Sequence, residues 1–282
     1  MDTKGNFISI KPNDPHIAKY IAYYYFHKSD DPDFHKKFFF YPNYKHALTV
    51  YRNSDAKLND HGSSVSPSDS EKLQIFYAVN TNKNLSVTLN GVFDKIGVVF
   101  NPLGLNHFID KPLCEIFQPL LDDFFHFGES FEKVVQNVYN ESDVNEKTNL
   151  LDGFFQKRWI AFDEPVLKKA VKELLNSNGA IRVEELSEML QVNRKTLLRL
   201  FKKHLCCSVE EYKKLVMFRN ALNYSQQKNG LLSLTDIALF NLYYDQAHFI
   251  KQFKSITKLS PKTLLSKITQ LGNQELYWNF DD

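Results

Sequence analysis

Polar and hydrophobic positions alternate over the first part of the chain as they do in β-strands. The segment LSVTL at 85–89 alternates strictly, and KLQIFYAV at 72–79 and KIGVVF at 95–100 have strand-type composition bounded by turn residues. The segments AYYYFH at 22–27 and KKFFFY at 36–41 are denser in aromatic residues, which is typical of strands buried on both faces. Short strands at this spacing predict a small β-barrel or sandwich.

The pattern changes at two places. The segment NDHGSSVSPSDS at 59–70 has the composition of a loop. From about Asn106 apolar residues recur at three-to-four-residue spacing, in EIFQPLLDDFF at 115–125 and FEKVVQNVY at 131–139, which predicts helices. Pro119 should kink or end the first of these helices, because proline cannot donate the backbone hydrogen bond that a helix interior needs.

After Pro165 the sequence predicts helices, and two copies of one unit are visible in it. LLRLFK at 197–202 and FIKQFK at 249–254 align at a spacing of 52 residues. Each is preceded by a short helical segment with a small residue after an apolar one, EELSEML at 184–190 and TDIALF at 235–240. Each copy is therefore expected to be a helix, a tight turn and a second helix.

A long helix is predicted between the two copies, over SVEEYKKLVMFRNALNYSQQ at 208–227. From Val209 to Gln227 it would be about 28 Å long at 1.5 Å per residue. This length is close to the roughly 34 Å repeat of B-DNA, so the rod would hold both second helices near successive major grooves. Capping residues support the boundaries: Asn193 and Asp245 at the start of each second helix, Ser208 with Glu211 and Ser233 with Asp236 at capping-box spacing, and Ser260 followed by Pro261.

The second helix of each copy has one apolar face and one basic face. The inward residues are Leu197, Leu200, Phe201 and Leu205 in the first copy and Phe249, Phe253 and Ile256 in the second. The outward residues are Lys195, Leu198, Arg199 and Lys202, matched by Ala247, Ile250, Lys251 and Lys254. Basic side chains can contact guanine edges or phosphates, and a small aliphatic side chain suits a thymine methyl. Any one of these residues alone fits a solvated helix face equally well, but two matched faces favour DNA binding.

Composition and charge agree with a DNA-binding C-terminal part. Residues 166–270 hold 18 Lys and Arg against 8 Asp and Glu, whereas the rest of the 282-residue chain holds 17 against 25. A basic module joined to an acidic one suggests a polyanion partner, although a well-solvated helical surface is the alternative. No apolar run approaches the roughly 20 residues of a membrane span, and no signal peptide is expected. The three cysteines, Cys114, Cys206 and Cys207, lack C-x-x-C spacing and suggest reduced thiols in a cytoplasmic protein.

The region from about Leu186 to Leu264 resembles the double helix-turn-helix module of the AraC/XylS transcription regulators. The resemblance is carried by LSEMLQVNRKTLLRLFKKHL, SVEEYKKLVMFRNAL, SLTDIALF and YYDQAHFIKQFKSITKLSP. In that family the second helix of each copy enters a major groove. By this resemblance the base-facing residues are Arg194, Lys195, Leu198 and Arg199 in the first copy and Gln246, Ala247, Ile250 and Lys251 in the second. The phosphate-contacting residues it implies are Thr196, Lys202, Lys203 and Lys254.

Several positions depart from the family pattern. Leu242-Tyr243 stands where Gly-Phe is usual, and Lys251 replaces an arginine, which exchanges a bidentate guanine donor for a point charge. Cys206 and Lys258 stand where each following turn usually has glycine, and Met217 where the linker helix commonly has arginine. The fold should tolerate these changes, whereas it stays open whether the second copy reads bases or only contacts phosphates.

Enzyme chemistry has little support in the sequence. The histidines show no H-x-H or H-E-x-x-H spacing, so no metal site of the cupin type is expected. The motifs G-x-S-x-G, Walker A and G-x-G-x-x-G are missing from the sequence as well. We therefore expect no enzyme, no cofactor and no metal. The aromatic segments are candidates for an apolar effector pocket made of Tyr24, Phe39, Tyr41, Tyr51 and Phe76, although a simple hydrophobic core is the favoured interpretation.

The expected fold class is α+β, with a β-rich, cupin-like barrel or sandwich followed by an all-α domain. The expected parts are an effector or sensor domain at 1–105, a helical connector and candidate dimerisation element at 106–165, the DNA-binding domain at 166–270 and a tail at 271–282.

The sequence predicts a DNA-binding transcription regulator that acts as an activator, although repression stays open. Its expected partners are double-stranded promoter DNA and RNA polymerase, with a small-molecule effector and a homodimer as further candidates and no membrane. The alternative is a ligand-binding or protein-interaction module whose DNA-binding domain no longer reads DNA.

Overall fold

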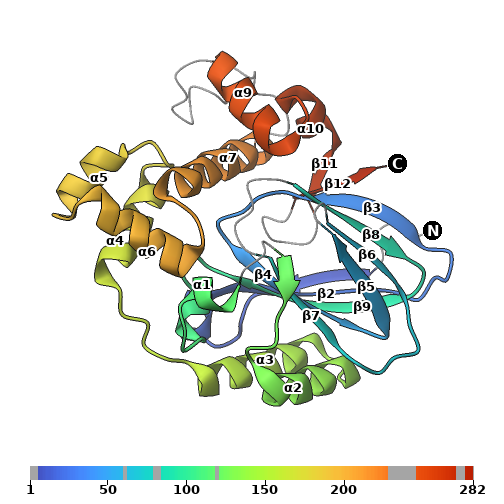
Figure 1. The fold of residues 1–282 in the computed structure, drawn as a ribbon. Helices are drawn as coiled ribbons and strands as arrows, with labels where there is room; N and C mark the ends of the chain where they lie inside the picture. The colour runs from blue at the N-terminus through green and yellow to red at the C-terminus, as the bar shows by residue number, and fades with distance from the viewer. Residues whose placement is uncertain are drawn as a thin grey trace.

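The computed structural model of the chain describes residues 6–59, 62–78, 84–117, 121–227, 246–270 and 277–281. It has a β-rich N-terminal part and a helical C-terminal part, as the sequence predicted (Figure 1). Within these ranges, none of the helices combines the length and the apolar character that crossing a bilayer requires.

The described strands form two six-stranded sheets, and all of these strands except β11 and β12 belong to the N-terminal part of the chain. In the first sheet the strands follow the order β1, β2, β9, β4, β7, β10, and all neighbours are antiparallel. These strands are β1 (Asn6–Ile10), β2 (Ile21–Ser29), β9 (Phe93–Phe100), β4 (His46–Arg52), β7 (Gln74–Ala78) and β10 (Leu121–Asp123). The central strands β2, β9 and β4 are buried over most of their length, which explains their density of apolar and aromatic residues.

The second sheet has the order β11, β12, β3, β8, β6, β5. Its strands are β11 (Ile268–Gln270), β12 (Tyr277–Asp281), β3 (His35–Phe40), β8 (Leu85–Asn90), β6 (Gly62–Pro67) and β5 (Ser54–Asn59). The prediction of a loop over 59–70 is wrong for β6, which pairs antiparallel with β5 and parallel with β8. The C-terminal residues 277–281 form β12, which adds to the edge of β3.

Side chains of alternate residues in the first sheet lie on opposite faces of it. In β4, Leu48 and Val50 belong to the core on the helix-covered face, whereas Ala47, Thr49 and Tyr51 face the second sheet. A strand's period of two residues produces this division. The space between the sheets is therefore lined by every second residue of the central strands.

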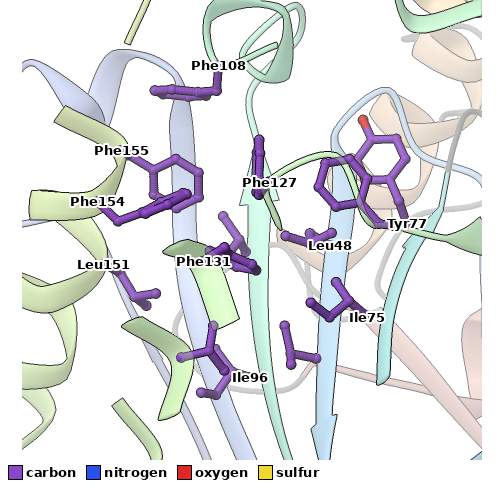
Figure 2. Close-up of a cluster of buried hydrophobic side chains, with 14 of the residues drawn as sticks. Leu48, Ile75, Tyr77, Ile96, Phe108, Phe127, Phe131, Leu151, Phe154 and Phe155 are labelled. Carbon is purple, nitrogen blue, oxygen red and sulfur yellow. The ribbon is translucent and has the colours of Figure 1, made fainter. Parts of the chain in front are cut away.

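The outer face of the first sheet is covered by the helices α2 (Gly128–Asn140) and α3 (Val144–Arg158) (Figure 1). Figure 2 shows the aromatic core between them, in which Phe127, Phe131 and Phe155 pack among aliphatic side chains of the strands. The helix predicted at 131–139 is confirmed. The helix predicted at 115–125 is wrong in part, because α1 (Leu113–Ile116) is short and residues 121–123 form β10 along the open edge of β7. Pro119 lies outside the described residues.

The remaining helices form the C-terminal part of the chain. They are α4 (Pro165–Asn176), α5 (Val183–Met189), α6 (Arg194–Leu205), α7 (Val209–Gln227), α9 (Gln246–Thr257) and α10 (Pro261–Lys267), and two short 3₁₀ helices, η1 (Ile17–Lys19) and η2 (Leu105–His107), belong to the N-terminal part. In Figure 1, α4, α5 and α6 gather at one end of the long helix α7, and α9 and α10 lie at its other end.

Candidate functional site

The first helix-turn-helix unit consists of α5 and α6, joined by a turn in which Gln191 is left-handed with φ 54°. The predicted N-cap is confirmed, because the Asn193 side chain accepts a hydrogen bond from the Thr196 backbone N–H at 2.8 Å. This bond satisfies one of the backbone donors that a helix start leaves unpaired. The apolar stripe of α6 is buried as predicted, with Leu197 and Phe201 fully covered.

The opposite face of α6 is exposed to solvent. Leu198 is 44% exposed, which is high for a leucine, and the side chains of Lys195, Arg199 and Lys202 are exposed beside it. Lys202 forms a 3.7 Å ion pair with Glu211 of α7. The other candidates on this helix also lie at or near the surface: Arg194 is exposed and pairs with Glu184 of α5, and Thr196 and Lys203 are half-buried.

The second unit presents the same kind of face on α9. Phe249 and Phe253 are buried against α7, whereas Gln246, Ala247 and Lys251 are exposed. Ile250 is half-buried and packs at the edge of this core. Lys254 is exposed one turn after Ile250. Residues 228–245 lie outside the described residues. The predictions that fall on them are the helix at 235–240, the caps Ser233, Asp236 and Asp245, and the pair Leu242-Tyr243.

Both helices end in a left-handed residue where the resemblance led us to expect glycine. Cys206 has φ 55° and Lys258 has φ 62°. A residue with a Cβ is strained in this region by about 1–2 kcal/mol. The turns therefore keep the geometry that the family gives to glycine, at a cost in stability.

The remaining predicted caps are confirmed where they are described. Ser208 and Glu211 form a reciprocal capping box at the start of α7, with distances of 2.6 Å and 3.2 Å. The Ser260 hydroxyl accepts from the Thr263 backbone N–H at 3.1 Å, and Pro261 is the first residue of α10.

A buried hydrogen bond connects the C-terminal end of α6 to the N-terminal part of the chain. The Asn106 side-chain amide donates to the His204 carbonyl at 3.2 Å, and both groups are buried. A shallow depression beside this contact is lined by Arg199, Lys202 and Cys206 of the first unit and by Cys114 and Phe117 of the α1 segment. Burial raises the pKa of the Cys206 thiol to about 11, so this thiol is protonated at neutral pH.

A cavity of about 80 Å³ lies between the two sheets. That volume is several times what one buried water molecule needs. Its wall is mainly aromatic and aliphatic, and among the described lining residues none is acidic, whereas two are lysines, Lys45 and Lys95. Lys95 on β9 is only 2% exposed, and its Nζ lies 5.2 Å from the ring centroid of Phe38 and 5.8 Å from that of Tyr51.

Burial lowers the pKa of the Lys95 ammonium to about 7, because the charged form loses its hydration inside the sandwich. Burial also raises the pKa of Tyr25 to about 12 and that of Tyr51 further still. Near neutral pH the charge of Lys95 therefore changes, whereas Tyr25 and Tyr51 stay neutral. A negatively charged group placed beside it would favour its protonated form.

The structure brings together two of the five effector candidates that the sequence suggested. Tyr51 and Phe76 both line the cavity. Tyr24 points to the other face of the sheet, where its hydroxyl donates to Asp152 of α3 at 2.7 Å. Phe39 and Tyr41 pack instead with the hydrophobic cluster of the second helix-turn-helix unit.

Sequence reasoning missed two charged residues of the interior, Lys95 and Arg219. Lys95 shares a strand face with Gly97 and Val99, so the period of two in KIGVVF contained the signal. Arg219 interrupts the apolar run LVMFRNAL of α7 and is 4% exposed. Among the residues that the structure describes, no group of three or more His, Cys, Asp or Glu side chains is placed to hold a metal ion.

Comparisons with known proteins assign the C-terminal region. A family model described as a helix-turn-helix domain matches residues 186–267. This region is therefore a helix-turn-helix domain of the AraC type, the class of DNA-binding module found in transcription regulators, and the resemblance predicted from the sequence is confirmed. No match was found among the curated proteins.

Solved structures of ToxT from Vibrio cholerae are similar to most of the chain. A 1.65 Å structure has 17% identity and a TM-score of 0.44, covering 93% of this chain and 97% of that one. A structure from strain O395 has 18% identity and a TM-score of 0.43, covering 93% and 96%. A third, described as bound to an unsaturated fatty acid, has 15% identity and a TM-score of 0.42, covering 95% and 96%. Likeness at this level transfers neither a ligand nor an activity to this chain.

Proposed function

We propose that the chain is a sequence-specific transcription regulator that places α6 and α9 in successive major grooves of promoter DNA. The observation that carries this proposal is the matched pair of surfaces at opposite ends of α7. Each surface presents an aliphatic residue next to a basic one, Leu198 with Arg199 and Ile250 with Lys251. Leu198 and Arg199 lie opposite the buried stripe of α6, whereas on α9 Lys251 is exposed and Ile250 is half-buried at the edge of the hydrophobic cluster.

The side chains of the two surfaces differ in the contacts that they can make with DNA. Arg199 has the planar donor pair that recognises guanine O6 and N7, and Leu198 suits a thymine methyl. Lys251 is a point charge and gives a less specific contact. Lys202 and Lys254, one turn further along each helix, are placed to neutralise phosphates. The first unit should therefore supply most of the sequence specificity.

A binding experiment tests the proposal. The affinity of the chain for DNA from the region upstream of its own gene is compared with that for random DNA, at two salt concentrations. Arg199→Ala should cost about 1–3 kcal/mol on the specific site and much less on random DNA. Lys169→Ala removes the same charge from an exposed position of α4 and is the matched control. An equal loss on both DNAs would show that Arg199 does not read bases.

The N-terminal cavity is the proposed effector site. Its apolar wall together with Lys95 and the absence of acidic groups among the described lining residues suits a small amphiphile with one negative charge. Such a molecule would bury its apolar part between the sheets and pair its anionic group with the Lys95 ammonium. Lys95→Met should therefore abolish selectivity for the acid over the corresponding alcohol, measured by calorimetric titration of dodecanoate and dodecanol.

RNA polymerase, a second copy of this chain and a cytoplasmic location stay predictions. The proposed effector site and the proposed DNA-binding site are separate. An effector can therefore change DNA binding only if it binds two conformations of the chain with different affinity, because otherwise it cannot shift their populations.

A further inference from the structure

One short segment, residues 38–45, contacts both the cavity and the DNA-binding region. It comprises the end of β3 and the turn into β4. Phe38 and Phe40 line the cavity, and Phe40 also packs on the cluster that Ala47 belongs to. Phe39 and Tyr41, between and after them, pack on the hydrophobic cluster of the second helix-turn-helix unit. We name this segment the strap.

Tyr41 is the most deeply buried aromatic residue of the strap. Its side chain is fully buried, and its ring centroid lies 6.5 Å from that of Phe218 of α7. Phe218 in turn packs on Phe253 of α9 at 5.1 Å between ring centroids. A close-packed interior transmits displacement, because it has few voids to absorb it. A shift of Tyr41 is thus passed to the helix that carries the second basic face.

Hydrogen bonds fasten the backbone of the strap to α7. The buried Arg219 guanidinium donates from Nε to the Pro42 carbonyl at 2.6 Å and from Nη2 to the Tyr41 carbonyl at 2.5 Å. A buried charge is costly to leave without its hydrogen-bond partners. The strap and α7 should therefore move together.

The end of the strap connects to the first unit. Tyr44 packs against the cluster formed by α4, α6 and the start of α7, while its neighbours Asn43 and Lys45 line the cavity. On the other side, β3 pairs with β12, which follows α10. Alternate residues of one segment thus contact the ligand cavity and both helix-turn-helix units.

We infer that the strap is the coupling element of this regulator. A molecule bound in the cavity displaces Phe38 and Phe40 and thereby shifts the backbone of the strap. The Arg219 hydrogen bonds transmit this shift to α7. Because α7 connects the two helix-turn-helix units, its position sets the relative placement of α6 and α9. The inference rests on the proposed function for its effect on DNA, but the contact between the strap and α7 is independent of DNA.

The test needs no identified ligand, because a side chain can fill the cavity. Ala47→Phe, and the smaller Ala47→Leu where the larger change prevents folding, place atoms against Phe40. Leu48→Phe on the same strand overpacks the opposite, helix-covered face and is the matched control. Hydrogen–deuterium exchange of the α7 amides and affinity for upstream DNA are measured in each variant, with and without Arg219→Met.

We expect the Ala47 variants to change exchange in α7 and to alter DNA affinity at least threefold, and the Leu48 variant to do neither. Adding Arg219→Met should remove most of the effect of the Ala47 change. Unaltered α7 exchange in a folded Ala47 variant, or an undiminished effect with Arg219→Met, would overturn the inference. The wild type and all variants could fail to bind upstream DNA while hydrogen–deuterium exchange in α7 still responds to the Ala47 changes. That result would overturn the proposed function and leave the coupling between the strap and α7 intact.

Discussion

Replacement of Lys95 by methionine should stabilise the protein, by an amount that falls as the pH rises. Methionine has a similar length and no charge, so it keeps the packing against Phe38 and Tyr51 and removes the buried ammonium. In the unfolded chain Lys95 takes up its proton below about pH 10.4. In the folded protein it does so only below about pH 7. Lys95 therefore lowers the free energy of unfolding at every pH at which its side chain is protonated in the unfolded chain.

The size of the penalty follows from the two pKa values. A pKa lowered from 10.5 to about 7 corresponds to about 5 kcal/mol against the charged form, at about 1.4 kcal/mol per pH unit. Because the folded-state pKa is depressed, the penalty is complete below pH 7 and disappears as the pH rises to that of the unfolded side chain. About 4 kcal/mol remains at pH 7 and about 2 kcal/mol at pH 9.

Urea unfolding of the wild type and of Lys95→Met at pH 7, 8 and 9 measures this difference directly. Other titrating groups cancel between the two proteins, and Tyr25 and Tyr51 stay neutral over this range because their pKa values are raised. The stability advantage of the variant should shrink by about 2 kcal/mol from pH 7 to pH 9. A difference that is constant with pH would refute the placement of Lys95 as a desolvated ammonium in the cavity wall.

Four further substitutions have expected outcomes. Leu198→Ala should leave the melting temperature nearly unchanged, because the side chain is 44% exposed, yet it should weaken specific DNA binding by about 1 kcal/mol in a gel-shift titration. Lys258→Gly should raise the stability by about 1 kcal/mol, because it relieves a left-handed residue at φ 62°. Lys254→Gly, which lies inside α9, should lower it by a similar amount. Asn193→Ala removes the N-cap of α6 and should cost about 1 kcal/mol in thermal unfolding followed by circular dichroism.

The C-terminal helices were predictable because local and tertiary signals agree there. The apolar stripe of α6, its Asn193 cap and the Ser208–Glu211 box all point to the same boundaries, and the structure has each of them. The exposure of Leu198 and Arg199 follows from the same helical period.

The strands β6 and β10 were missed in the sequence. The segment that contains β6 is rich in Ser and Gly, so its composition resembles a loop, but β5 and β8 on either side pair with its backbone. Residues 121–123 have helical spacing and form β10 instead, because β7 offers an unpaired edge. β8 is distant in sequence from β6, and β7 from β10, so no local pattern contained these two pairings, whereas β5 directly precedes β6 and only the loop-like composition concealed that pairing.

Only some of the residues that line the cavity could be predicted from the sequence. Aromatic density pointed to the right strands, but Tyr24, Tyr51 and Phe76 fall on different faces, and only the register of the sheet separates them. The role of Arg219 depends on carbonyls of residues 41 and 42, some 178 positions away in the chain. Such a contact becomes visible only once the two parts of the chain have been placed together.

Methylation interference on an upstream DNA site tests the central claim most directly, because it reports which guanine N7 atoms in the major groove the protein needs. The two-helix arrangement predicts two clusters of interfering guanines about one helical turn, roughly 10 base pairs, apart. Arg199→Ala should erase one cluster and Lys251→Ala should weaken the other. A single cluster, or two clusters that both survive these substitutions, would contradict the placement of α6 and α9 in successive grooves.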